Sequence, residues 1–213
     1  MTPTRLCLVR HGETEWNAAG RVQGQLDIPL GATGFAQARA VARALEGERF
    51  DAIWSSDLVR VRQTAEPTVS LLNQRMVLDP RLRERHYGVF QGITYAEAKE
   101  RFPDDYGRFK AKDLDFDFET GESLRTFNDR CLGFFDFLLG KHPGQSLLVF
   151  THGGVLECLY RHATGRGLTT PRDFEIPNAA LNRLELGPEG WRVWSWADIA
   201  HLAAALDDLP DAR

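Results

Sequence analysis

Length, composition and charge exclude several classes of protein. The chain has 213 residues, of which 43% are hydrophobic and 26% charged, and its formal net charge is −4. This is the composition of a globular chain whose length suits one domain, and it excludes a mainly disordered or fibrous protein. The negative charge gives no general attraction to nucleic acid or anionic membranes, so we expect neither as a partner, and any phosphate must be held by local cations.

Short apolar runs alternate with helical patterns along the chain. The predicted strands cover residues 6–9, 51–55, 146–150, 181–186 and 191–196. The predicted helices cover residues 33–45, 57–72, 121–139 and 154–163. The second of these helices is expected to begin with a cap at Ser56 or Asp57. Strands that alternate with helices predict an α/β fold, a three-layer sandwich with a mainly parallel sheet.

The segment 95–120 interrupts this alternation, because it is rich in charged and aromatic residues. We expect it to be partly helical and to cap one end of the sheet. Its acidic side chains, which we expect to form a solvated face, are Asp104, Asp105, Asp113, Asp115, Asp117 and Glu119. The chain is therefore interpreted as one domain, residues 1–213, with an insertion at about 95–120.

Two histidines follow the ends of predicted strands. His11 follows the first strand, beside Arg10, and His152 follows a later strand. Ligands bind at the carboxyl ends of strands in open α/β sheets, so we expect both histidines to face one crevice. The glycines that follow them, Gly12 and Gly153, allow a ligand to approach the backbone. A single histidine of this kind is as often structural as functional, but two matching strand ends favour a functional site.

Arg60 and Glu84 are the other charged candidates. Arg60 lies near the start of the helix that follows the strand at 51–55, where anions are favoured, although a surface arginine paired with Asp57 or Glu66 is the alternative. Glu84 lies in the locally basic run 81–86, where an ordinary salt bridge with a neighbouring arginine is the alternative.

Taken together, these segments resemble the histidine phosphatase superfamily, also called the phosphoglycerate mutase-like family. The resemblance rests on five motifs in order: Arg10-His11-Gly12 with Asn17, the run Arg21 to Leu30, the run Ser55 to Thr64, Leu82-Arg83-Glu84 leading to Tyr87-Gly88, and Thr151-His152-Gly153-Gly154. The matches extend from residue 5 to about residue 186. This resemblance implies a phosphoglycerate mutase-like fold with a small helical insertion over the active site.

The resemblance also implies a role for each matching residue. His11 is expected to be the nucleophile that becomes a phosphohistidine, and Glu84 the acid and base. The expected phosphate pocket comprises Arg10, Arg60 and His152. The residues expected to line the phosphate or the adjoining substrate site are Asn17, Gln23, Gly24 and Gly153.

The chemistry of phosphoryl transfer agrees with these roles. Such transfer depends on positioning and charge neutralisation, which two arginines, an imidazole and backbone N–H groups supply without a metal. Because no His, Cys or carboxylate cluster has metal-ligand spacing, we expect neither a metal nor another cofactor. The chain departs from many relatives at Asp57, Val61, Tyr87, Phe90 and Gln91, which affects the expected substrate pocket and not the chemistry.

The cysteines and the hydropathy pattern indicate a cytoplasmic protein. Cys7, Cys131 and Cys158 form neither a zinc spacing nor an even disulfide framework, so a reducing compartment is expected. No run of about 18 apolar residues is present, and the first ten residues lack a signal peptide's apolar core.

The sequence therefore predicts a metal-independent phosphatase that hydrolyses small phosphomonoesters through phospho-His11. One alternative is a phosphoglycerate mutase, which returns the phosphoryl group to an isomeric hydroxyl. The short stretch of about 67 residues between Glu84 and His152 favours hydrolysis. A second alternative is a phospholigand-binding or interaction module without turnover, but such a module needs no nucleophile with a proton donor. The identity of the ester and the oligomeric state stay open.

Overall fold

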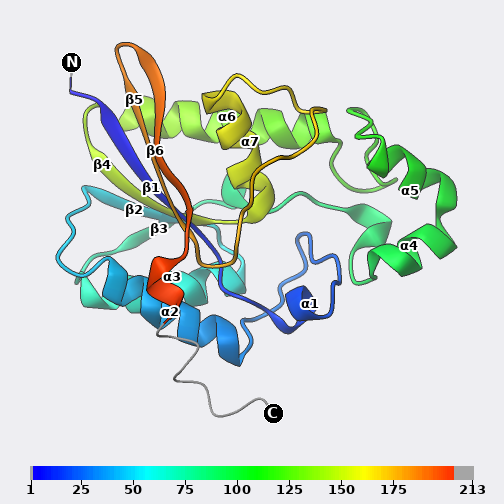
Figure 1. The fold of residues 1–213 in the computed structure, drawn as a ribbon, viewed down its shortest axis with the longest axis horizontal. Coiled ribbons are helices and arrows are strands. Elements are labelled where there is room, and N and C mark those ends of the chain that lie inside the picture. Colours follow the sequence, from blue (N-terminus) through cyan, green and yellow to red (C-terminus); the bar gives the residue numbers. More distant parts are fainter. Residues whose placement is uncertain (1, 204–213) are drawn as a thin grey trace.

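A six-stranded sheet lies between two layers of helices in the computed structural model, which describes residues 2–203 (Figure 1). The strands are β1 (Thr4–Arg10), β2 (Ala52–Ser55), β3 (Met76–Leu78), β4 (Ser146–Thr151), β5 (Leu181–Gly187) and β6 (Gly190–Asp198). Their order is β3-β2-β4-β1-β5-β6. The first four strands in this order pair in parallel. Strand β5 pairs antiparallel with β1, and β6 pairs antiparallel with β5. The predicted mainly parallel sheet is confirmed.

Helices cover both faces of the sheet, which confirms the predicted sandwich. They are α1 (Glu15–Ala18), α2 (Ala32–Ala44), α3 (Val59–Leu71), α4 (Tyr95–Arg101), α5 (Pro103–Lys110), α6 (Leu124–Lys141) and α7 (Gly153–Ala163), with 3-10 turns at Pro80–Leu82, Gly88–Phe90 and Ala200–Leu202. Helices α2 and α3 lie on one face, and α6 and α7 lie on the other (Figure 1). Within residues 2–203, no helix has the length and apolarity needed to span a membrane.

The side chains of the central strand β1 are apolar on both faces of the sheet, because helices cover both faces. Leu6 and Leu8 pack on the side of α6 and α7, whereas Cys7 and Val9 pack on the side of α2 and α3. All four side chains are buried. This alternation is the expected pattern for a strand that is covered on both faces, and it fixes the strand ends between two cores.

The start of α3 differs from the sequence prediction. The helix begins at Val59, and neither Ser56 nor Asp57 caps it. The N–H of Val59 donates instead to Asp27, 32 positions earlier, at 2.6 Å. Strand β3 was not predicted at all, because it has only three residues and two of them are exposed.

The segment 95–120 contains α4 and α5, in agreement with the expected helical content. Its buried side chains Ala98, Phe116 and Phe118 pack with Val22 and Phe90, and they form a cluster separate from the two cores beside the sheet. Figure 1 shows α4 and α5 beside the sandwich and not over either face of the sheet.

Candidate active site

A cavity of about 140 Å³ brings together seven of the nine residues that the sequence singles out. These seven are Arg10, His11, Asn17, Gln23, Gly24, Arg60 and Glu84. The cavity is also lined by Arg21, Val22, Tyr87 and Tyr95, which the sequence analysis did not name as site residues. We refer to it as the phosphate cavity.

His11 continues β1 beyond its last residue, because its N–H donates to the carbonyl of Thr151 at 2.9 Å. Its ring Nδ1 lies 2.7 Å from the carbonyl of Gly12. A carbonyl only accepts hydrogen bonds, so Nδ1 carries the proton and Nε2 keeps its lone pair. Burial, followed by the positive charges of Arg60 and Arg10, holds the pKa of His11 well below its usual value. The imidazole is therefore neutral, and the lone pair of Nε2 carries no proton.

The peptide of Gly12 is fixed from two sides. Its N–H donates to Thr64 Oγ1 at 2.9 Å, and its carbonyl accepts from Asn178 Nδ2 at 3.3 Å. A Cβ at this position would lie 2.7 Å from the carbonyl oxygen of Gly34, so only glycine fits. Thr64 and Asn178 thus set the orientation of His11 indirectly. Neither residue could be assigned this role from the sequence, because both act through the folded backbone of Gly12.

His152 lies behind the cavity and is fully buried. Its ring is 5.2 Å from that of His11, centroid to centroid. Its Nδ1 is 3.2 Å from Arg60 Nη2, and since arginine only donates, Nδ1 accepts. Nε2 then carries the proton and donates to Ser56 Oγ at 2.9 Å. Burial, followed by the charge of Arg60, holds the pKa of His152 well below its usual value. Both ring nitrogens of His152 therefore form hydrogen bonds, and the bond at Nδ1 orients Arg60.

Two arginines line the cavity, and backbone carbonyls hold both of them. Arg60 donates to the carbonyls of Gly24 and Leu26 at 2.7 and 2.8 Å, and Arg10 donates to the carbonyl of Ile176. The Nε atoms of both arginines are buried without a hydrogen-bond partner within residues 2–203. Burial lowers the pKa of Arg60 to about 10, so it is still a cation at neutral pH.

The carboxyl group of Glu84 is held by two backbone donors. Oε1 accepts from the N–H of Arg85 at 2.8 Å, and Oε2 accepts from the N–H of Gly154 at 3.0 Å. Arg81 and Arg83 form ion pairs with aspartates and not with Glu84. The alternative of a salt bridge from Glu84 to either of these arginines is therefore wrong.

The two candidate glycines have different surroundings. Gly24 has a positive φ of +55°, and a Cβ there would lie 2.1 Å from Gln91 Oε1. Its carbonyl accepts from Arg60, so Gly24 orients that arginine. Gly153 is the first residue of α7 and does not line the phosphate cavity, but a Cβ on it would lie 3.4 Å from Arg10 Nε.

The two candidate amides present different atoms to the cavity. The Oδ1 atom of Asn17 accepts from the N–H of Thr14 at 3.1 Å and from Asn178 at 3.5 Å. Nδ2 is therefore left to donate into the cavity. Gln23 is buried, and its Oε1 has no hydrogen-bond partner within the described chain.

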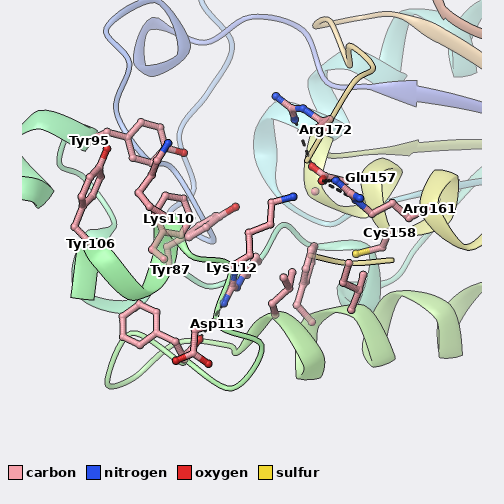
Figure 2. Close-up of a pocket in the computed structure, with 17 residues that line it drawn as sticks. Tyr87, Tyr95, Tyr106, Lys110, Lys112, Asp113, Glu157, Cys158, Arg161 and Arg172 are labelled. Atoms are coloured by element: carbon pink, nitrogen blue, oxygen red, sulfur yellow. Dashed lines mark hydrogen bonds and ion pairs between the residues drawn. The ribbon is translucent and has the colours of Figure 1, made fainter. Parts of the chain in front are cut away.

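Figure 2 shows a second, larger cavity of about 450 Å³, and this cavity adjoins the phosphate cavity because the two share lining residues. Tyr87 and Tyr95 line both cavities. Gly154 lines the larger cavity and donates its N–H to Glu84 in the smaller one. As for metal ligands, residues 2–203 contain no group of three or more His, Cys, Asp or Glu side chains placed to hold an ion.

Comparison with known proteins places the chain in a family. The model of the histidine phosphatase superfamily (branch 1) matches residues 6–199. The metal-independent phosphoserine phosphatase of Arabidopsis thaliana is 37% identical over 204 residues, which are 94% of this chain and 84% of the relative. Phosphoglycerate mutase-like protein 4 of the same plant is 37% identical over 201 residues, 92% of this chain and 86% of that protein.

Solved structures agree with the sequence relatives. The structure of Bacillus stearothermophilus YhfR matches with a TM-score of 0.87 at 29% identity, covering 93% of this chain and 99% of that one. The family, the fold and the phosphatase class expected from the sequence are thus confirmed, and this chain belongs to the histidine phosphatase superfamily.

Proposed function

We propose that this enzyme hydrolyses small-molecule phosphomonoesters through a phosphohistidine at His11. The observation that carries the proposal is the neutral imidazole with its Nε2 lone pair, in one cavity with the guanidinium groups of Arg10 and Arg60. The positive charges of these arginines attract a phosphoryl group into the cavity, which puts an electrophilic phosphorus beside the nucleophile.

In the first step, the Nε2 lone pair of His11 attacks phosphorus while the bond from phosphorus to the ester oxygen breaks. Arg10 and Arg60 balance the charge on the non-bridging oxygens, and Asn17 Nδ2 is a further donor. Protonated Glu84 gives its proton to the leaving oxygen, which departs as an alcohol.

In the second step, the carboxylate of Glu84 takes a proton from water as the water oxygen attacks the phosphorus. The phosphorus–nitrogen bond breaks, its electron pair returns to His11, and inorganic phosphate is released. The N–H groups of Arg85 and Gly154 hold the carboxyl group in place through both steps. His152 acts as a positioning residue, because its ring accepts from Arg60 and packs against His11.

We further propose that the enzyme needs no metal or other cofactor and works in the cytoplasm. The arginines supply the charge that a metal would otherwise supply. All three cysteines are free and buried, as is usual in a reducing compartment.

A phosphoglycerate mutase is the second candidate, because one relative at 37% identity carries the name phosphoglycerate mutase-like. The same phosphohistidine would then pass its phosphoryl group to a hydroxyl of the substrate instead of to water. The relative named metal-independent phosphoserine phosphatase favours hydrolysis, and phosphoserine is accordingly the first ester to assay.

The test is to quench turnover of a radiolabelled ester and follow the label on the protein. We expect an acid-labile, base-stable phosphoenzyme in the wild type and in His152→Ala, and none in His11→Ala. The turnover of His11→Ala is expected to fall by roughly 10⁴-fold or more, as for loss of other nucleophiles. Label that persists in His11→Ala and vanishes in His152→Ala would reverse the two histidines. Release of 2-phosphoglycerate, and not of inorganic phosphate, from 3-phosphoglycerate would establish the mutase.

A further inference from the structure

The larger cavity has the size and position of a binding site for the leaving group. Its volume of about 450 Å³ lies within the roughly 300–1,000 Å³ of pockets that bind drug-sized organic ligands. It shares Tyr87 and Tyr95 with the phosphate cavity, and its wall at Gly154 contacts the proposed acid Glu84. An ester whose phosphate lies in the small cavity therefore extends its organic part into the large one.

The walls of this cavity are more basic than the protein as a whole. The chain has a net charge of −4, yet five basic and only two acidic side chains line the cavity. The basic ones are Arg85, Lys110, Lys112, Arg161 and Arg172, and the acidic ones are Asp113 and Glu157. Asp113 pairs with Arg108, which lies outside the lining, at 2.8 Å. Glu157 is thus the carboxylate left to oppose the basic wall.

Glu157 is shared between cations. Its Oε1 accepts from Arg161 at 2.8 and 2.9 Å, and its Oε2 accepts from Arg172 at 3.3 Å. The ammonium of Lys112 donates to a neutral carbonyl, that of Thr170, at 2.8 Å. Burial, followed by the charge of Arg161, lowers the pKa of Lys112. One carboxylate therefore faces three cations, and this wall carries an excess of positive charge.

The backbone at Lys112 is in a conformation that lysine rarely adopts. Its φ is +53°, in the left-handed region that favours glycine and asparagine. Holding a lysine in this conformation costs a free energy on the order of 1 kcal/mol. The backbone conformation therefore gives no reason for a lysine at position 112. Figure 2 shows the side chain extending toward Glu157, Arg161 and Arg172, across the cavity from the tyrosines. Arg172 is 52% exposed, so it is free to turn toward a ligand.

Resting on the phosphatase function proposed above, we propose that the larger cavity binds the leaving group and that Lys112 and Arg172 bind a second anionic group on it. The aromatic wall, which includes Tyr87, Tyr106 and Phe109, packs against the organic part between the two anions. The substrate class is then a bulky phosphomonoester that carries a carboxylate, or another anion with similar oxygens, far from the ester bond.

The test compares 4-(2-carboxyethyl)phenyl phosphate with its neutral amide. The two esters have the same shape and nearly the same leaving group. The ratio of their kcat/KM values therefore measures how much the second anion stabilises the transition state. We expect the wild type to prefer the acid by about tenfold or more, the usual worth of a hydrogen bond to a charged group. The double variant Lys112→Asn with Arg172→Gln is expected to bring the ratio close to one while activity on the amide is kept.

Two features of the design separate binding from folding. Asparagine tolerates a positive φ, so Lys112→Asn is expected to unfold at the same temperature as the wild type or higher. Lys99→Asn is the matched control, because Lys99 also belongs to the segment 95–120 but does not line the cavity. This control is expected to keep the wild-type preference.

Three outcomes overturn the inference. The first is equal kcat/KM for acid and amide in the wild type, and the second is an unchanged ratio in the double variant. The third is hydrolysis of nitrophenyl phosphate but of neither larger ester. In each of these cases the phosphatase function still stands. Failure on all three esters, with no phosphoenzyme, would count against the phosphatase function itself.

Discussion

The two adjoining cavities differ in how their functional groups are held. In the phosphate cavity, buried contacts fix the reactive groups: His11 donates to a carbonyl, and Glu84 accepts from two backbone N–H groups. In the larger cavity, Lys112 follows the end of α5, and Arg172 lies in the coil before β5. The difference teaches that the groups proposed for the chemistry common to all phosphoesters are held by buried contacts near the sheet. The groups proposed for selectivity lie on segments that the sheet does not constrain.

Glu84→Gln is expected to give the largest effect that tests this division. Glutamine keeps the size and has no acid proton to donate, and it keeps one of the two backbone hydrogen bonds, because its amide nitrogen cannot accept the other. Phosphorylation of the enzyme by alkyl phosphates is expected to fall by roughly 10²–10⁴-fold, the usual range for general acid catalysis. The fall on nitrophenyl phosphate is expected to be clearly smaller, because its phenolate leaves without a proton. Rapid-quench measurement of the phosphorylation step gives both values.

The first step must be measured alone, because Glu84 also activates water in the second. Equal losses on both esters would mean that Glu84 only positions the substrate. The proton would then come from another group, and His86, which follows Glu84 closely in the chain, is the next candidate.

Gly154→Ala tests whether the fixed position of the Glu84 carboxyl group matters, and it replaces no reactive side chain. The new Cβ would lie 2.2 Å from Glu84 Oε1, so the carboxyl group must move. We expect a loss of about 10²-fold on alkyl phosphates, the cost of misplacing a catalytic group by roughly 1 Å. Gly153→Ala is the comparison, because its Cβ would lie at an ordinary 3.4 Å from Arg10 Nε. Equal losses in both variants would show that the start of α7, and not Glu84, is disturbed.

The sequence predicted the phosphate cavity better than its neighbour, for a physical reason. His11 and His152 follow directly on β1 and β4, and parallel strands bring their carboxyl ends to one edge. Thr64 and Asn178 were missed because they act only through the folded backbone of Gly12.

The larger cavity depends on contacts that no local pattern records. Lys112 meets a carbonyl 58 positions away, and the cluster around Glu157 joins α7 to the coil at Arg172. Likewise, α3 starts two residues later than predicted because distant Asp27 accepts from its first N–H. Such long-range partners are set by tertiary packing, which periodicity and turn signals do not contain.

The pH dependence of stability is expected to separate the two cavities. His11 and His152 have pKa values held well below 6.5 in the folded state. The unfolded chain therefore binds more protons as the pH falls below about 6.5, and stability is lost over that range. Each histidine contributes at most about 1.4 kcal/mol per pH unit. The lowered pKa of Lys112 acts only in the alkaline range, near its usual 10.5.

Urea unfolding at several pH values between about 7.5 and 5 measures this slope. The carboxyl groups with lowered pKa values, such as Asp57 and Glu122, titrate below their usual 3.8 and 4.5 and stay outside this range. Replacing both His11 and His152 by asparagine is expected to reduce the slope, and the slope that is left comes from His201, whose pKa burial also lowers. A variant whose curve runs parallel to that of the wild type would show that neither imidazole is held neutral by the fold.

Exhaustive chelation is expected to have the smallest effect, which is none. In the phosphate cavity Arg10 and Arg60 are the cations proposed to balance the phosphoryl charge, and in the larger cavity Lys112 and Arg172 are the cations proposed to bind the second anion. Hydrolysis of nitrophenyl phosphate and of the carboxyethyl ester should therefore both survive treatment with a chelator and dialysis. Loss of both activities, with recovery on adding a divalent ion, would refute the mechanism at His11. Loss confined to the carboxyethyl ester would leave that mechanism intact and place the ion between the second anion and the larger cavity, so the basic wall alone would not explain the selectivity.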